Sequence, residues 1–122
     1  MRVSKSRGIT HYFTHSSLQG CTALRELNLS YNHLEGLLTP LQGCTALRTL
    51  ELAHNLLMGD MAPLQGCAAL REVYMSHNQL SGDLDLLLGC TALQYICLSN
   101  NKITATDEVK AHFEKQGQLF RI

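Results

Sequence analysis

The sequence predicts an α/β-type solenoid, a right-handed coil that carries a short parallel sheet along one side and ends in a capping helix. Three observations predict this fold: a segment that recurs at a constant interval, apolar and polar residues that alternate inside each copy, and a helical pattern after the last copy. A fixed interval of this kind is typical of chains that stack similar coils. The 122 residues are therefore expected to form one domain.

Each copy begins with the same short segment. Leu18-Gln-Gly-Cys-Thr-Ala-Leu24 recurs with few changes at Leu41, Leu64 and Leu87, so the copies start at a constant interval of 23 (41 − 18, 64 − 41 and 87 − 64). The frame Leu-x-x-Leu-x-Leu-x-x-Asn-x-Leu follows from the last Leu of every segment. Where the frame changes, the substitute is still apolar, as at Val73, Met75, Ile96 and Ile103.

The four in-register copies resemble the leucine-rich-repeat family, and the resemblance covers residues 18–103. It implies a four-repeat coil whose strands form a parallel sheet on its concave face, and a role as a recognition scaffold. The residues support the same fold independently, because x-Leu-x-Leu-x alternates as a half-buried strand does. One such strand cannot bury its leucines alone, so we expect successive coils to stack and pair their strands.

Two polar or small columns in the repeat are interpreted as structural. An Asn side chain can bond the backbone groups that a turn leaves unpaired, and each repeat has one at the end of the predicted strand. A Gly in the Leu-x-Gly that follows is expected to relieve a strained or closely packed backbone. The columns are Asn32, Asn55, Asn78 and Asn101, and Gly36, Gly59 and Gly82.

Residues 104–122 predict a C-terminal cap, a helix followed by a short strand. Thr104 and Asp107 have the spacing of a capping box, and Gly117 is a good helix stop. A last truncated strand is expected at 119–122. The alternative is a detached tail whose helix binds a partner; the cap is favoured because the apolar residues of this segment need cover.

Residues 1–17 are expected to form an irregular or disordered leader. When the leader is shifted by the repeat length, Ser4 and Ser6 fall where core leucines belong, so no cap is visible before Leu24. The leader also lacks the uninterrupted apolar centre of a secretory signal, and the expected compartment is the cytosol. A basic leader without acidic residues leaves an organelle transit peptide as an alternative.

Composition and charge narrow the classes of partner. Apolar residues make up 45 % and charged residues 16 % of the chain, and ten basic residues balance ten acidic ones. A neutral chain has no overall attraction to nucleic acid or to an anionic membrane, so neither is expected as a partner. No apolar run approaches the length of a membrane-spanning helix.

The cysteines are interpreted as two kinds. Cys21, Cys44, Cys67 and Cys90 share one repeat position and are expected to form a buried column of reduced thiols. A single file of thiols does not converge on zinc, and no metal or cofactor is expected. Cys97 lies between two core positions of its strand and faces outward, either as a reactive thiol or as a half-buried bystander.

The resemblance implies that a partner binds the concave face, so the outward positions of the strands are the candidate site. Tyrosines and histidines there are expected to cluster and anchor an interface. The stacked arginines either grip a partner's carboxylates or form a solvated ladder neutralised by Glu26, Glu51 and Glu72. The candidate residues are Arg25, Arg48, Arg71, Asn28, Glu51, Tyr74, Tyr95, Tyr31, His54 and His77.

The predicted function is a non-enzymatic protein–protein interaction module that binds another protein on its concave face. One alternative is a fragment of a longer leucine-rich-repeat protein without independent activity. Another is a cysteine-dependent hydrolase that uses Cys97 with His77, although no catalytic motif is present and a nucleophile needs an oriented base. His54 and His77 lack a third ligand for a metal.

Overall fold

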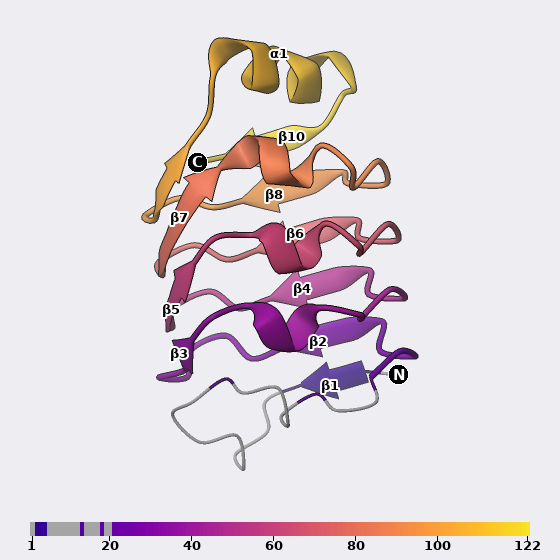
Figure 1. Ribbon diagram of the computed structural model, residues 1–122, viewed down its shortest axis with the longest axis vertical. Coiled ribbons are helices and arrows are strands. Elements are labelled where there is room, and N and C mark those ends of the chain that lie inside the picture. Colours follow the sequence, from indigo (N-terminus) through magenta and orange to yellow (C-terminus); the bar gives the residue numbers. More distant parts are fainter. Residues whose placement is uncertain (1, 5–12, 14–17, 19–20) are drawn as a thin grey trace.

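The protein is described by a computed structural model that defines residues 2–4, 13, 18 and 21–122. Figure 1 shows a stack of coils, each of which runs from one sheet to a second sheet and returns along the opposite side. This arrangement confirms the predicted solenoid. In the part of the chain that is described, no helix is both long and apolar enough to cross a membrane.

The predicted sheet has six parallel strands in the order β1-β2-β4-β6-β8-β10. Its register places Leu27 beside Leu50, Leu50 beside Val73, and Val73 beside Ile96. Equal repeat length therefore aligns equivalent residues in columns across the sheet. The strands are β1 (Arg2–Ser4), β2 (Glu26–Asn28), β4 (Thr49–Glu51), β6 (Glu72–Tyr74), β8 (Tyr95–Cys97) and β10 (Leu119–Arg121).

A second sheet, which the sequence analysis did not predict, follows the asparagine turns. It has four parallel strands, and its order is β3-β5-β7-β9. The shortest strand has two residues and the longest has five, so alternation of apolar and polar residues is barely visible in them. The strands are β3 (Glu35–Gly36), β5 (Leu56–Gly59), β7 (Gln79–Asp83) and β9 (Lys102–Thr104).

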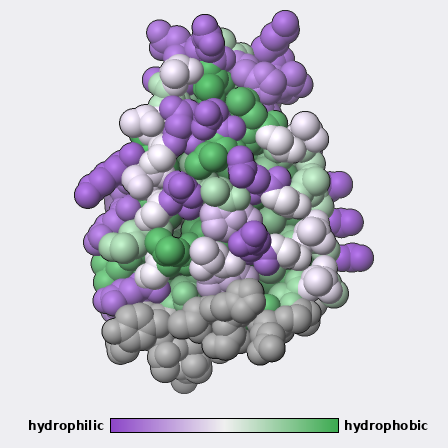
Figure 2. Space-filling model, in the orientation of Figure 1, coloured by the Kyte–Doolittle hydropathy of each residue, from purple (hydrophilic) through white to green (hydrophobic). Residues whose placement is uncertain are grey.

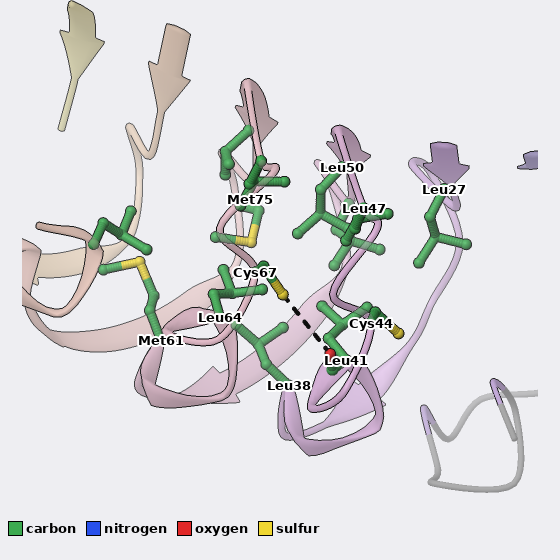
Figure 3. Close-up of a cluster of buried hydrophobic side chains, with 14 of the residues drawn as sticks. Leu27, Leu38, Leu41, Cys44, Leu47, Leu50, Met61, Leu64, Cys67 and Met75 are labelled. Atoms are coloured by element: carbon green, nitrogen blue, oxygen red, sulfur yellow. Dashed lines mark hydrogen bonds between the residues drawn. The ribbon is translucent and has the colours of Figure 1, made fainter. Parts of the chain in front are cut away.

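Short 3₁₀ helices return the chain on the side away from the six-stranded sheet: η2 (Thr39–Leu41), η3 (Ala62–Leu64) and η4 (Leu84–Leu87). Apolar side chains from the sheets and these helices fill the space between them, as Figure 3 shows for Leu50, Leu64 and Met75. Leu27 is 1 % exposed, and Leu50, Val73 and Ile96 are 0 % exposed. The repeated apolar positions thus form one continuous core.

The asparagine column bonds backbone groups of its turns, as predicted, and also ties neighbouring coils together. Asn55 Nδ2 donates to the carbonyl oxygens of Leu29 and Leu52, each at 3.0 Å, and Asn55 Oδ1 accepts from the Leu34 N–H at 3.0 Å. Asn78 repeats this pattern one coil later. A buried amide therefore satisfies backbone groups of two coils at once.

The glycine column allows the second sheet to pack closely, which confirms its predicted role. Gly59 has φ +82° and Gly82 has φ +90°, a left-handed backbone that glycine adopts without strain. A Cβ at Gly59 would lie 2.6 Å from Leu37 Cδ2, and one at Gly82 would lie 2.9 Å from Asp60 Cβ. A side chain at Gly59 would displace the end of the Leu37 side chain, and one at Gly82 would press against Asp60 in the neighbouring coil.

The N-terminal segment differs from the predicted irregular leader. Arg2–Ser4 form strand β1, which pairs with β2 and places Val3 opposite Leu27. The two paired positions lie one step further apart in the sequence than the repeat interval, so a comparison at that interval placed serines at the core positions. Phe13 is buried, and its N–H donates to the Glu35 carbonyl at 2.8 Å. The remainder of the predicted leader lies outside the described residues.

The C-terminal segment forms the predicted cap, with two differences. Helix α1 (Asp107–Lys115) begins at Thr106, whose hydroxyl accepts from the Val109 N–H at 3.2 Å. The proposed capping box at Thr104 is therefore wrong, because Thr104 is held in β9 and donates to the Gly82 carbonyl. Ile122 remains 40 % exposed instead of covered.

The inner face of the cap packs on the last coil, whereas its outer side is polar. The Phe113 side chain of α1 is buried, and its ring centroid lies 6.0 Å from that of Phe120 in β10. Figure 2 shows hydrophilic side chains crowding this end of the molecule. A terminal element with one apolar and one polar side is what the end of a repeat stack requires.

Candidate partner-binding surface

The outward side chains of β2, β4, β6 and β8 form one surface, here called the sheet face. It corresponds to the concave face predicted from the sequence. In β4, β6 and β8 the middle residue is buried and the two flanking residues are half-exposed. The sheet face therefore displays Thr49, Glu51, Glu72, Tyr74 and Tyr95 at neighbouring positions.

Two tyrosines lie at the centre of the sheet face. The rings of Tyr74 and Tyr95, here called the tyrosine pair, stack with centroids 5.0 Å apart and planes inclined by 30°. Partial burial raises the pKa of Tyr74 above its ordinary value, and the carboxylate of Glu72, which also bonds its hydroxyl, adds to the rise. The tyrosine pair is thus a fixed, neutral aromatic surface next to negative charge.

A hollow of about 270 Å³ adjoins this pair on the sheet face. Its lining comes from three adjacent strands and is mostly polar. The lining residues are Glu26, Leu27, Asn28, Thr49, Glu51 and Glu72. Carboxylates therefore line the depression where β2, β4 and β6 meet.

A second stack lies where the strands of the six-stranded sheet end. Tyr31 and His54 have ring centroids 4.4 Å apart, and His54 and His77 have centroids 4.2 Å apart. Asn100 Nδ2 lies 3.2 Å from His77 Nε2 and continues the column. All four residues, here called the ring column, have left-handed backbones with φ between 57° and 59°.

The structure thus divides the single aromatic cluster expected from the sequence into two. The tyrosine pair stands on the strands, and the ring column stands on the turns after them. Sequence periodicity could place these residues in columns, but it could not show which columns stack. Tyr31, at one end of the ring column, is 71 % exposed.

Arg25, Arg48 and Arg71, here called the arginine column, are all exposed. Within the described chain, no ion pair joins Arg48 or Arg71 to Glu51 or Glu72. Asn28 is half-buried, and its side chain accepts from the Ser30 N–H at 3.2 Å. Whether the arginine column grips a partner or is a solvated ladder stays a prediction.

Three of the four cysteines predicted to form a buried column do so. Cys44, Cys67 and Cys90 are buried and free, whereas Cys21, in the first coil, is half-buried. Burial raises the pKa of the Cys67 thiol to about 12, and the neighbouring Cys90 and Cys44 add to the rise. Its Sγ lies 3.9 Å from the Leu41 carbonyl oxygen, the contact drawn in Figure 3. These thiols are core residues.

The hydrolase alternative gains no support from the geometry. Cys97 is half-buried, and its Sγ lies 3.7 Å from Ser99 Oγ. His77 instead bonds Asn100, so no base is placed against the Cys97 thiol in the described part of the chain. Among those same residues there is no group of three or more side chains that could hold a metal ion.

An apolar flank on the second sheet was missed by the sequence analysis. Leu37 and Met58 are each 48 % exposed, and Leu56 is 39 % exposed. Leu56, Met58 and Gln79 line a hollow there. The signal was present in the sequence, because these apolar residues occupy positions that the repeat frame leaves variable, but nothing in the frame marks them as exposed.

Comparison with family descriptions identifies the class of protein. Residues 4–57 match the family described as "Leucine rich repeat", and residues 68–111 match the one described as "Leucine Rich repeats (2 copies)". Together these matches span most of the chain. The chain belongs to the leucine-rich-repeat family, as the repeat frame predicted. No curated protein matches the sequence.

Solved structures show the same fold. The leucine-rich-repeat ectodomain of the receptor kinase SOBIR1 from Arabidopsis thaliana aligns with a TM-score of 0.77 and 24 % identity, over 98 % of this chain and 65 % of that one. Internalin C2 from Listeria monocytogenes aligns with a TM-score of 0.70 and 26 % identity, over 85 % and 43 %.

A further match is a structure of a complex. The ectodomain of the Arabidopsis thaliana receptor kinase GASSHO1/SCHENGEN3, solved with CASPARIAN STRIP INTEGRITY FACTOR 2, aligns with a TM-score of 0.73 and 26 % identity. The match covers 84 % of this chain and 13 % of that chain. This chain therefore spans less than two thirds of the length of each of these relatives.

Proposed function

We propose that this chain is a non-enzymatic module that binds a protein partner on its sheet face. One observation carries the proposal: the tyrosine pair stands on a sheet surface that remains half-exposed along β4, β6 and β8, and the arginine column lies directly before the strands. Aromatic and arginine side chains supply much of the energy of protein interfaces. A rigid sheet also fixes the backbone beneath them, which lowers the ordering cost of binding.

The relatives support the choice of a protein as partner. Leucine-rich-repeat domains generally mediate protein–protein interaction, and one related ectodomain was solved as a complex. The residues that contact the partner are proposed from the geometry of this chain alone. The cytosolic setting belongs to the same proposal and is supported by the free thiols of Cys44, Cys67, Cys90 and Cys97, since reducing compartments keep cysteines unpaired.

The test is a double variant of the two aromatic stacks. Affinity capture with the intact chain identifies the partner, and calorimetric titration compares the wild type with Tyr74→Ala/His54→Asn. Asparagine is chosen at His54 because Asn100 occupies the equivalent left-handed position. Binding is expected to weaken by at least about 2 kcal/mol if these residues are hot spots.

A matched control changes residues far from the sheet face. His112→Ala/Glu114→Ala alters two exposed positions of α1 and is expected to bind the partner as the wild type does. Equal affinity of the wild type and Tyr74→Ala/His54→Asn for the partner would contradict the proposal.

The chain as part of a longer leucine-rich-repeat protein is the second candidate. Its basis is the coverage of the relatives, of which this chain spans 65 % at most among the three compared. A transcript whose reading frame continues the repeats would support this candidate, and mass spectrometry of the native protein at 13.5 kDa would contradict it.

A further inference from the structure

We propose that the sheet face binds a basic segment of its protein partner and seats one lysine or arginine side chain over the tyrosine pair, beside Glu51 and Glu72. This inference rests on the proposed function, because it specifies the chemistry of the partner that docks on the same surface. Charge complementarity and the stacked rings carry it.

The placement of negative charge on the sheet face is the first step. Glu51 lies directly opposite Tyr74 in the pairing of β4 with β6, and Glu72 lies opposite Tyr95 in the pairing of β6 with β8. Each ring of the tyrosine pair therefore has a carboxylate as its neighbour across the strands. Both glutamates are half-buried, so water screens them less than it screens a fully exposed charge.

The second step is that, in the described chain, neither arginine next to these two carboxylates pairs with them. Arg48 and Arg71 point out at exposed positions and form no ion pair with Glu51 or Glu72. The carboxylate of Glu72 instead lies beside the phenol of Tyr74, whose hydroxyl stays neutral because burial and this negative charge both raise its pKa. The centre of the sheet face thus holds two carboxylates that form no ion pair with Arg48 or Arg71 in the described chain.

The third step concerns the tyrosine pair, which favours a positively charged side chain over a neutral hydrogen-bond donor. The face of an aromatic ring attracts a positive charge, and a carboxylate next to the ring adds to that attraction. Lysine and arginine also have long apolar stems that can lie along the rings and enter the adjoining 270 Å³ hollow. An acidic segment would meet Glu51 and Glu72 and be repelled.

The experiment uses three synthetic peptides of one length as probes. One alternates lysine and alanine, the second carries acetyl-lysine in place of lysine, and the third carries glutamate. Each is titrated into the intact protein while the ring signals of Tyr74 and Tyr95 are followed by NMR. The lysine peptide is expected to shift both signals and to bind at least about fivefold more tightly than the other two.

Variants then locate the seat. Glu51→Gln/Glu72→Gln keeps the size of both side chains and is expected to weaken lysine-peptide binding at least about fivefold. Glu35→Gln/Glu114→Gln removes the same charge at two exposed positions away from the sheet face and is expected to bind as the wild type does. Unchanged far-ultraviolet circular dichroism of both variants shows that they are folded.

Three outcomes overturn the inference: no shift with the lysine peptide, equal binding of the lysine and acetyl-lysine peptides, or equal loss in both glutamine variants. If the glutamate peptide binds instead and Arg48→Gln/Arg71→Gln abolishes that binding, the inference fails while the sheet face survives as a docking surface. The proposed function would fail on a different result, namely a captured partner that binds Tyr74→Ala/His54→Asn as tightly as it binds the wild type.

Discussion

Asn55 shows how a single side chain holds two coils in register. Its amide donates to one carbonyl in its own turn and to another in the preceding coil, and its oxygen accepts an N–H of that coil. The side chain is only 5 % exposed. Because these backbone groups are buried, water cannot replace the amide if it is removed.

Replacing Asn55 with alanine is therefore expected to lower the free energy of unfolding by about 3 kcal/mol, because it leaves buried backbone donors and acceptors unpaired. Urea denaturation followed by circular dichroism measures the change. Asn32→Ala is the matched control in the end coil, where the side chain is half-buried and bonds two carbonyls of its own turn. A loss at Asn55 no larger than that at Asn32 would contradict this account.

For single residues, the sequence predicted the structural role of a side chain better than it predicted which other side chains that residue touches. The repeat position of Asn55 and Gly59 was enough to predict what each does, because a column of identical residues shares one backbone environment. The stack from Tyr31 to His77 could not be predicted, because it depends on left-handed backbones that no residue type in the repeat demands.

A helix or strand could be predicted from the sequence only where its apolar and polar residues form a clear pattern. The strands of the six-stranded sheet alternate around a buried centre, and their register follows from the repeat length. The second sheet is hidden in the sequence because strands such as Glu35–Gly36 are too short to show a period. Helix α1 was expected, but the spacing of a capping box pointed to Thr104 as its start, whereas Thr106 caps it.

The two threonines give a direct test of where α1 begins. Thr106→Ala removes the hydroxyl that accepts from the Val109 N–H and is expected to destabilise the protein by about 1 kcal/mol. Thr104→Ala serves as the control, since its hydroxyl is exposed and caps no helix. Thermal melts of both variants measure the difference. A larger effect at Thr104 would restore the capping box predicted from the sequence.

At the scale of the whole molecule, three neighbouring coils share a column of buried thiols. Cys44, Cys67 and Cys90 occupy one repeat position, and burial raises the pKa of each thiol above its ordinary value. A raised pKa in the folded state means that the unfolded chain releases its protons first as the pH increases. Stability from the Cys67 thiol is therefore present below about pH 9 and lost between there and its folded pKa of about 12. The raised pKa values of Cys44 and Cys90 act in the same direction.

The urea midpoint is accordingly expected to fall between pH 8 and pH 10, and to fall less in Cys67→Ala, which has one fewer buried thiol to ionise. Comparing the two proteins at each pH removes the contribution of the lysines and tyrosines that both contain. An equal fall in both would show that the Cys67 thiol ionises as readily in the folded protein as in the unfolded chain.

The global fold was predicted from one arithmetic fact, the constant spacing of the copies. Both ends of the six-stranded sheet depart from it, because Arg2 pairs with Glu26 and Tyr95 with Leu119, each pair one position further apart than the repeat interval. A search at one fixed period therefore found the middle of the stack and missed strand β1. The candidate surface followed from the fold, whereas the separation of its charges required the side-chain positions.

The left-handed backbone of the ring column does not suit all of its residues equally. A left-handed backbone is unfavourable for most side chains, and asparagine and histidine tolerate it better than tyrosine does. Tyr31 stands in that conformation with φ +59° while most of its surface faces solvent. Asparagine would adopt this conformation with less strain, so Tyr31 carries a backbone cost that burial of its ring does not offset.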